Sequence, residues 1–404
     1  MDMLKLALDS RVPFISVKTD DLVYSVDVLK YIAETDVKPF VPSGSPSECA
    51  LPSTIVSYTS DEALCIPTLY RRMKEEGKVL VFMNIKPSVL PFNGGTLLPP
   101  LPLMKSTLLK VLDDDEEKVE SLKMSFGGLT LKDARELIAM TKEKYGDVTA
   151  SRVNHVRKGY ITKLKGMVQV DTDQDFYQKP MNLQAWVDKN GYFFKNDLHH
   201  SLTPRGLLFL GPPGTGKTAG AKAIASALDV PLFRLDVGGM KGKYVGDSEG
   251  NLQAVLQTLD QMAPCVAILD EIEKMFSSQS DQGVTSSMLG TLLWWLQEHE
   301  SKVLTIMTTN NKNALPPELY REGRIDSKLE FWGLESDEES KEFAGHVAKM
   351  LVADSKVETI EGLVAAAMQK ASNLFQNCNT GKIPQSLVTQ EVRELVKQHI
   401  LEAL

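Results

Sequence analysis

One segment of the chain has the residue types needed to bind phosphate groups. Residues 211–218 read Gly-Pro-Pro-Gly-Thr-Gly-Lys-Thr, and they follow a short apolar run at Leu207 to Leu210. The glycines leave room for backbone N–H groups to surround phosphate oxygens, and the N-terminus of a following helix adds its positive end. Lys217 would reach the β- and γ-phosphates of a nucleoside triphosphate, and Thr218 would offer its hydroxyl to Mg²⁺. The segment therefore predicts a phosphate-binding loop between a strand and a helix.

Two adjacent carboxylates follow a second apolar run, Cys265 to Leu269. A strand beside the first would bring Asp270 and Glu271 to the phosphate end of the sheet. Asp270 would then hold Mg²⁺ through water, and Glu271 would polarise the water that attacks the γ-phosphate. Taken alone, such a pair is equally typical of an ordinary strand end. The residues that we assign to nucleotide binding are Gly211, Pro212, Pro213, Gly214, Thr215, Gly216, Lys217, Thr218 and Asp270, with Thr218 and Asp270 also assigned to the metal.

Further polar residues follow a third apolar run, Val303 to Met307. Asn310 comes shortly after it, and a side-chain amide there would orient the attacking water between the two phosphate-binding strands. Farther along, Arg321 and Arg324 lie three residues apart in the segment ELYREGRID. Two arginines at this spacing are usually surface ion-pair partners, and the residues alone leave that alternative open.

The segments GPPGTGKT, AILDEIEK, TTNN and ELYREGRID occur in this order, and together they resemble the motifs of the AAA family of ATPases. The resemblance implies that Asn310 reads the γ-phosphate and that Arg321 and Arg324 are arginine fingers, which reach into the site of a neighbouring subunit. It also implies ATP and Mg²⁺ as cofactors and an oligomeric ring, most often a hexamer, with ATP sites between subunits. An arginine presented in this way contributes about 10³ to 10⁵ in rate.

Within that family, the chain is similar to the AAA proteins encoded by a conserved open reading frame of algal chloroplast genomes and cyanobacteria. The stretches that carry this similarity include RLDVG, VGDSE and TLLWWLQE. Those proteins have an N-terminal α/β domain of nucleotide-binding type that lacks a phosphate loop, and the start of this chain has the same layout. The resemblance covers Leu202 to Asp326 and weakens beyond Phe331, where Arg393 is the candidate for an arginine of the lid.

A glycine-flanked aromatic lies between the first two strands of the phosphate-binding module, at Gly242 to Gly246. In remodelling members of the family, the matching aromatic projects into the ring pore and grips an extended polypeptide. Tyr244 occupies that position, with Lys243 beside it, so the resemblance implies a pore loop. The alternative, a tyrosine packed under the sheet, stays open.

The order of apolar runs and helical patterns predicts an α/β protein in two parts. Short β-rich runs such as Pro13 to Val17 and Val79 to Ile85 alternate with helical stretches, and none is followed by a phosphate loop. Pro87 to Pro102 is predicted to be a loop, and Thr130 to Lys165 to be helical, with a capping box at its start. We therefore expect an N-terminal α/β domain lacking a P-loop at 1–126, a helical connector at 127–170, a P-loop NTPase (AAA) three-layer module at 171–333 and a small helical lid at 334–404.

Composition excludes several classes of protein. The chain has 404 residues, of which 43% are hydrophobic, enough for about two or three globular domains. A net charge of −8 provides no general positive field for nucleic acid. The four cysteines form no CxxC pair, which argues against a disulfide framework and a structural zinc site. Because no apolar stretch approaches the ~20 residues of a membrane span and no signal peptide is evident, we expect a cytoplasmic protein with no membrane partner.

These observations give one main hypothesis of function and two alternatives. The main hypothesis is an ATP-hydrolysing AAA protein that acts as a homo-oligomeric ring, expected to be a hexamer, and remodels or threads an unidentified protein partner. The first alternative is an ATP-binding switch or assembly scaffold with slow turnover. The least favoured is a nucleic acid motor or loader, because of the net negative charge.

Overall fold

The chain consists of two compact units, Met1–Thr149 and Ala150–Leu404. The division falls inside the stretch predicted to be a helical connector, residues 127–170. The computed structural model describes residues 2–35, 37–40, 54–57, 67–84, 91–160, 166–172, 181–196, 198–236, 247–276, 282–321, 323–352, 360–378 and 381–403.

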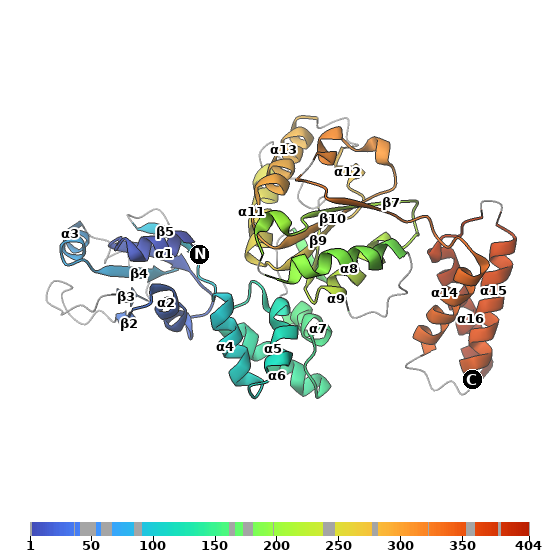
Figure 1. The fold of residues 1–404 in the computed structure, drawn as a ribbon, viewed down its shortest axis with the longest axis horizontal. Helices are drawn as coiled ribbons and strands as arrows, with labels where there is room; N and C mark the ends of the chain where they lie inside the picture. Colours follow the sequence, from blue (N-terminus) through green and yellow to red (C-terminus); the bar gives the residue numbers. More distant parts are fainter. Residues whose placement is uncertain are drawn as a thin grey trace. The chain divides into compact units, whose positions relative to one another are not determined.

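The first unit is built on a parallel five-stranded sheet with the order β2-β3-β4-β1-β5 (Figure 1). Its central strand β4 is a continuous apolar run, and Phe14 of β1 packs edge-on against Phe82 of β4 with ring centroids 5.3 Å apart. The elements are α1 (Asp2–Asp9), β1 (Phe14–Lys18), α2 (Ser25–Ala33), β2 (Val37–Phe40), β3 (Thr54–Ser57), α3 (Pro67–Glu75), β4 (Val79–Met83) and β5 (Phe92–Thr96).

The prediction of a loop from Pro87 to Pro102 is wrong in part, because β5 lies within it. The two glycines in this stretch suggested a loop, but Gly94 is packed closely. A Cβ atom at Gly94 would lie 3.0 to 3.1 Å from side-chain atoms of Leu4, Ile15 and Val17. A larger residue at Gly94 would therefore have to displace side chains of α1 and β1 for this edge strand to lie where it does.

A group of helices follows β5. It comprises α4 (Leu101–Val111), α5 (Glu116–Leu122), the short 3₁₀ helix η2 (Lys123–Phe126) and α6 (Leu131–Tyr145). The capping box predicted at the start of α6 is confirmed: Thr130 accepts from the backbone N–H of Asp133, whose carboxylate accepts from that of Thr130. Gly146 ends α6 in the left-handed conformation, so the predicted helical stretch is divided before α7 (Ala150–Tyr160).

The second unit contains a six-stranded sheet with the order β11-β7-β10-β9-β8-β6. Five strands are parallel, and β6 pairs antiparallel with β8 at the edge. This edge strand lies in the range predicted to be a helical connector. The strands are β6 (Met167–Val170), β7 (Gly206–Leu210), β8 (Leu232–Leu235), β9 (Cys265–Leu269), β10 (Val303–Thr309) and β11 (Ser327–Glu330).

Helices cover both faces of this sheet (Figure 1). Apolar side chains of α11 and α13 form one core cluster with the strands, while α8 and α9 pack on the opposite face. The elements are α8 (Met181–Lys195), η3 (His200–Leu202), α9 (Lys217–Ala227), α11 (Asp247–Gln261), α12 (Glu273–Phe276), α13 (Gln282–Glu298), η4 (Lys312–Ala314) and η5 (Pro317–Tyr320). The predicted α/β class is confirmed.

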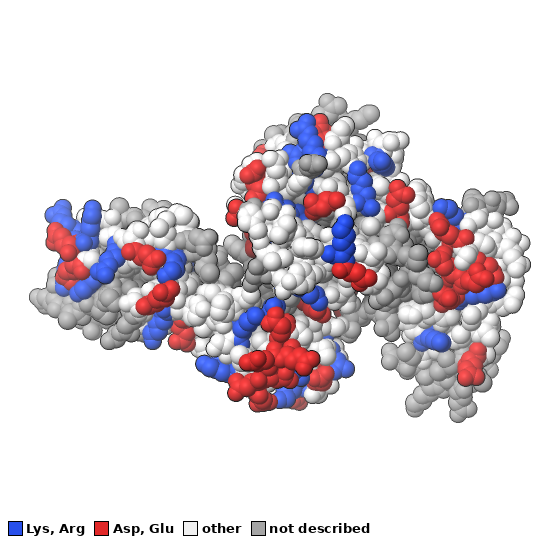
Figure 2. Space-filling view, viewed as in Figure 1, with Lys and Arg blue, Asp and Glu red and all other residues white. Residues whose placement is uncertain are grey.

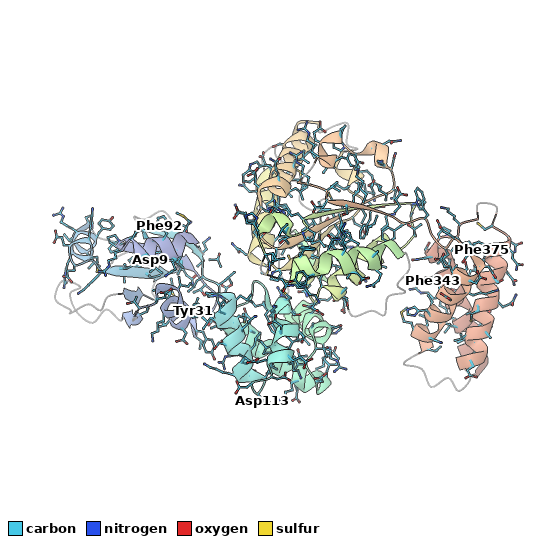
Figure 3. The ribbon with its side chains drawn as sticks, in the orientation of Figure 1. Asp9, Tyr31, Phe92, Asp113, Phe343 and Phe375 are labelled. Atoms are coloured by element: carbon cyan, nitrogen blue, oxygen red, sulfur yellow. The ribbon has the colours of Figure 1, made fainter. Side chains whose placement is uncertain are left out.

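A bundle of helices, the lid, ends the second unit. It consists of α14 (Asp337–Val352), α15 (Ile360–Gln376) and α16 (Gln385–Ala403). The lid has its own apolar cluster, to which Phe343 of α14 belongs and against which Phe375 of α15 packs (Figure 3). Leu334 and Ile383 exchange backbone hydrogen bonds at the base of the bundle.

The two units share one strand order. We number the parallel strands of each unit along the chain and leave out the antiparallel β6. Across both sheets the order is then fifth, first, fourth, third, second: β5-β1-β4-β3-β2 in the first unit and β11-β7-β10-β9-β8 in the second. In both units helices follow the fifth strand. The first unit therefore repeats the architecture of the second, although the sequence shows no repeat of a motif.

Charges are mixed over the surface. Figure 2 shows Asp and Glu side chains gathered over α5 and α6 and again over the helices that end the second unit, with Lys and Arg intermixed with them elsewhere on the face in view. Within the described parts of the chain, no helix combines the length and apolar character needed to span a membrane.

Candidate nucleotide-binding site

The candidate site lies where three neighbouring parallel strands end. Strand β10 lies between β7 and β9, and Thr309 is paired with Leu210 while Met307 is paired with Leu269. All three strands are fully buried, which fixes their register against the helical layers. Because parallel strands end at the same edge, the residues that follow them are brought together. The sequence predictions for Lys217, Asp270 and Asn310 concern residues at this edge.

The loop between β7 and α9 has the backbone of a phosphate cradle. Gly214 and Gly216 have φ angles of 77° and 88°, which disfavour residues with a side chain. A Cβ at these positions would also collide with Ser386 and Gln385 of the lid. Thr215 is buried, and its hydroxyl donates to the carbonyl oxygen of Pro212 at 2.8 Å. Together these features keep N–H groups of the loop and of the α9 N-terminus free of side-chain obstruction.

Lys217 is the first residue of α9, and its ammonium group is held at the centre of the loop. The Nζ atom donates to the carbonyl oxygens of Gly211 at 2.7 Å and Pro212 at 2.8 Å, and to Oδ1 of Asn310 at 2.8 Å. Burial lowers the pKa of Lys217, and the carboxylate of Asp270 opposes this effect. A phosphate oxygen at this place would meet a positioned cation.

Asp270 and Thr218 provide oxygen atoms of the kind that Mg²⁺ prefers. The Thr218 hydroxyl lies 3.4 and 3.3 Å from the two carboxylate oxygens of Asp270. Thr308, a buried residue of β10, orients this carboxylate by donating to Oδ1 at 2.6 Å. The donor set fits a magnesium ion bound beside the phosphate loop, as the sequence predicts. Sequence reasoning gave no role to Thr308, whose place inside a strand hides its polar contacts.

Glu271 follows Asp270 and has a left-handed backbone conformation, with a φ of 52°. Its N–H donates to the Thr308 hydroxyl at 2.9 Å, and its carboxylate contacts Lys274 and, at 3.5 Å, the side-chain amide of Asn310. The Lys274 ammonium lowers the pKa of Glu271, with burial opposing and Asn310 assisting. Glu271 is therefore an ionised carboxylate close to the loop, as a residue that polarises water must be.

A cavity of about 500 Å³ connects these residues with the lid. The lid contributes one face of α14, from Phe343 to Met350, and one face of α16, from Gln385 to Arg393. Sequence reasoning found only Arg393 among them, although the spacings of three, four and seven residues are a helix-face signal. The lining residues are Pro213, Gly214, Gly216, Lys217, Thr218, Ala219, Lys222, Asp270, Glu271, Asn310, Phe343, His346, Val347, Met350, Gln385, Ser386, Thr389 and Arg393.

The two arginines predicted to be fingers lie outside the lining of this cavity. Arg321 follows η5 and is exposed. Arg324 is half-buried and donates to the carbonyl oxygen of Glu318 at 2.7 Å and to Oε1 of Gln297 at 3.1 Å. Arg324 thus stabilises its own chain, whereas the Arg321 side chain faces solvent. The predicted pore-loop residues Lys243 and Tyr244 lie outside the described residues.

Comparison with known proteins adds the family of this domain. Residues 207–332 match the family model described as "ATPase family associated with various cellular activities (AAA)". The match contains the loop at 211–218, both carboxylates, Asn310 and both arginines. The second unit therefore carries an AAA domain, and the predicted P-loop fold is confirmed.

The relatives agree with this match. A protein of Guillardia theta, "Uncharacterized AAA domain-containing protein ycf46", is 30% identical over 57% of this chain and 48% of its own length. "Peroxisomal ATPase pex6" of Schizosaccharomyces pombe is 32% identical over 49% of this chain and 21% of its own. The "26S proteasome regulatory subunit 6B homolog" of Aspergillus niger is 30% identical over 42% of this chain and 44% of its own. This chain thus spans half or less of each of these relatives.

Proposed function

We propose, from the AAA domain at residues 207–332, that this protein hydrolyses ATP with Mg²⁺ in an oligomeric ring and uses the energy to remodel a protein partner. One observation carries the hydrolytic part. Lys217, Asp270, Glu271 and Asn310 come from three neighbouring strand ends and line one cavity. ATP hydrolysis requires such a set, because a cation, a metal ligand and a polarising carboxylate act on one phosphate.

Each residue has a role that follows from its contacts. Lys217 would bind the β- and γ-phosphates, and Asp270 with Thr218 would hold the magnesium ion, which neutralises charge on those phosphates. Glu271 would accept a hydrogen bond from the attacking water. Asn310 already contacts both Lys217 and Glu271, so it would orient the water toward the γ-phosphate.

The proposal of a ring rests on Arg321. A phosphoryl-transfer site gains about 10³ to 10⁵ in rate from an arginine that stabilises the transition state. Arg321 is exposed and does not line the cavity of its own chain, which fits donation to a second copy. Because Arg324 is already bound to Glu318 and Gln297, we assign the role in trans to Arg321 and a supporting role to Arg324.

Action on a protein partner is supported by the relatives alone. Two proteins of similar AAA domain are named as a peroxisomal ATPase and as a proteasome regulatory subunit. We also propose a hexameric ring and a cytoplasmic location, which rest on the sequence alone. The presence of Glu271 beside Lys217 and Asp270 in one cavity favours turnover over an ATP-binding switch.

Mixing two inactive variants tests the proposal. Lys217→Ala removes phosphate binding and keeps Arg321, while Arg321→Ala keeps the phosphate loop and removes the arginine. In an equimolar mixed ring, about a quarter of the interfaces would pair an intact loop with an intact arginine, so ATPase activity should reappear. Mixing Lys217→Ala with Glu271→Gln, which alters the same site of the same chain, provides the contrast. In this second mixture no chain carries both Lys217 and Glu271, so every interface should stay inactive. If the first mixture is as inactive as its components, the arginine does not act in trans.

A further inference from the structure

The loop after β1 in the first unit corresponds in place to the phosphate loop of the second. Both sheets have the same strand order, and the loops that follow their first strands, residues 19–24 and 211–216, have the same length. In both units the neighbouring fourth strand is followed directly by an asparagine, Asn84 after β4 and Asn310 after β10. The first unit therefore has the framework of a nucleotide site.

The residues that bind phosphate are missing from this loop. Residues 19–24 read Thr-Asp-Asp-Leu-Val-Tyr, without a glycine, and Ser25 opens α2 where Lys217 opens α9. None of these loop residues has a positive φ, in contrast to Gly214 and Gly216. The loop therefore cannot form the glycine cradle of the second unit.

In this loop a carboxylate accepts hydrogen bonds from the backbone N–H groups instead. Oδ1 of Asp21 accepts from the backbone N–H of Val23 at 3.0 Å and of Tyr24 at 2.9 Å. Asp21 is only 3% exposed. N–H groups at the end of such a loop, just before the helix, are the ones that bind phosphate oxygens in a phosphate loop. Tyr24, the N-cap residue of α2, offers no side-chain cap of its own.

The second oxygen of this carboxylate reaches a distant helix. Oδ2 of Asp21 accepts from the backbone N–H of Lys132 at 3.1 Å, and Lys132 is the second residue of α6, the last helix of the first unit. The second unit has a matching contact, in which the backbone N–H of Ser386, the second residue of α16, donates to the carbonyl oxygen of Gly214 at 3.0 Å. Each unit thus joins the loop after its first strand to the start of its last helix.

Asn84 holds the other end of the loop. Its Oδ1 accepts from the N–H of Thr19 at 2.8 Å, and its Nδ2 donates to the carbonyl oxygen of Thr19 at 2.9 Å. In the second unit, Asn310 makes its contact with Lys217 and stays beside the cavity. Asn84 therefore ties the start of the loop to the end of β4, whereas Asn310 lines a cavity.

We propose that Asp21 is a built-in substitute for a nucleotide phosphate, and that it holds the first unit closed without a ligand. The carboxylate places a negative charge at the N-termini of α2 and α6, where helix dipoles favour an anion. Two of its three backbone hydrogen bonds, from Val23 and Tyr24, use the N–H groups that a phosphate would need, and the third joins the loop to α6. The first unit is then a module of fixed shape, and each chain binds one nucleotide, in the second unit.

Amide hydrogen exchange of the full chain, read by mass spectrometry, tests this proposal locally. Asp21→Asn keeps the size of the side chain and an acceptor for Val23 and Tyr24, but it directs an NH₂ group at the N–H of Lys132. We expect exchange in the first turn of α6 to become about 10-fold faster or more, as the loss of a charge-assisted hydrogen bond implies. Asp20→Asn removes the same charge from an exposed neighbour and should exchange as the wild type does. Unchanged exchange in α6 of Asp21→Asn would make Asp21 a local turn residue and refute the proposal.

Rescue by an anion tests the substitution itself. In Asp21→Gly, we expect inorganic phosphate or pyrophosphate to restore slow exchange in residues 19–35 and at the start of α6, and to leave these segments unchanged in the wild type. If neither anion restores protection, Asp21 does not stand in for a phosphate. If Asp21→Gly loses protection from exchange throughout the first unit, the variant is unfolded there, and exchange at the start of α6 in Asp21→Asn then tests the proposal. The readout needs no ATP hydrolysis, so its failure would be distinguishable from failure of the proposed function.

Discussion

The Nζ atom of Lys217 lies 2.8 Å from Oδ1 of Asn310, so the first residue of α9 is hydrogen-bonded to the residue that follows β10. The same amide lies 3.5 Å from the Glu271 carboxylate through its Nδ2 atom. Asn310 therefore links the group that would bind phosphate to the group that would polarise water. A change at this one residue should affect the chemical step more than nucleotide binding.

We expect Asn310→Ala to lower kcat for ATP hydrolysis by about 10²-fold, the usual effect of removing one positioned amide, with a small change in KM. Steady-state kinetics at saturating Mg²⁺ measures both. Asn313→Ala, at an exposed position of η4 nearby, serves as the matched control and should keep the activity of the wild type. A kcat for Asn310→Ala within twofold of the wild type would contradict the role of Asn310.

The pH dependence of hydrolysis should depend on Lys274. Its ammonium lowers the pKa of Glu271, so that the carboxylate stays ionised to a lower pH than an ordinary glutamate. Lys274→Met removes that charge, the pKa of Glu271 rises, and the acid limb of the kcat profile should move to higher pH. Lys349→Met, at an exposed site on α14, changes the net charge equally and should leave the limb in place. Superimposable profiles for Lys274→Met and the wild type would show that Glu271 does not control this limb.

Two threonines of β10 provide a paired test of the strand's polar contacts. Thr308→Val removes a hydroxyl that donates to Asp270 and accepts from the N–H of Glu271, so it should cost about 1 to 3 kcal/mol in free energy of unfolding and most of the ATPase activity. Thr305 is equally buried, and its hydroxyl has no hydrogen-bond partner among the described residues. Thr305→Val should be neutral or stabilising. Urea unfolding and ATPase rates compare the two, and equal losses would show that the contacts of Thr308 are unimportant.

The stability of the second unit should fall in mild acid because of His299. Burial lowers the pKa of His299 to about 4, with Asp260 opposing and Arg205 assisting. Since the unfolded chain has the ordinary, higher histidine pKa, it binds a proton first as the pH falls. Stability is therefore full above the unfolded pKa and is lost between that value and about pH 4, by up to about 3 kcal/mol.

His299→Gln isolates this contribution, because all carboxylates titrate alike in both proteins. The difference in free energy of unfolding between the wild type and the variant should shrink as the pH is lowered from 7.5 to about 4.5. Unfolding followed by tryptophan fluorescence is suitable, since Trp295 stacks on His299 with ring centroids 4.2 Å apart. A difference independent of pH would mean that His299 is not buried in its neutral form.

The sequence allowed the main elements of the site to be predicted because they depend on local pattern. The apolar run before Gly211 and the run before Asp270 are β7 and β9, and parallel pairing then brings their ends together. Strand β5 could not be predicted, since the reason for Gly94 is its close packing against α1 and β1, which are distant in the chain. The edge strand β6 pairs with β8 far along the chain, so its short alternating pattern gave no sign of a strand.

The function of polar residues was predictable only where a motif marks them. Lys217 belongs to one, and its contact with Asn310 follows from strand order. Asp21 belongs to no motif. Its partner Lys132 lies 111 residues farther along the chain, so only the fold brings the two together. Equal loop lengths at residues 19–24 and 211–216 are a signal that could have directed attention to it, once the strands were known. The roles of Arg321, Arg324 and Tyr244 stay predictions.

Ser386 and Gln385, at the start of α16, lie against the phosphate loop beside Gly214 and Gly216. A Cβ atom at Gly214 would lie 2.1 Å from Oγ of Ser386, and one at Gly216 would lie 2.3 Å from Oε1 of Gln385, so a larger residue at either position would hold the lid farther from the loop. The lack of a side chain at these two loop positions thus sets how closely the lid can lie against the phosphate loop.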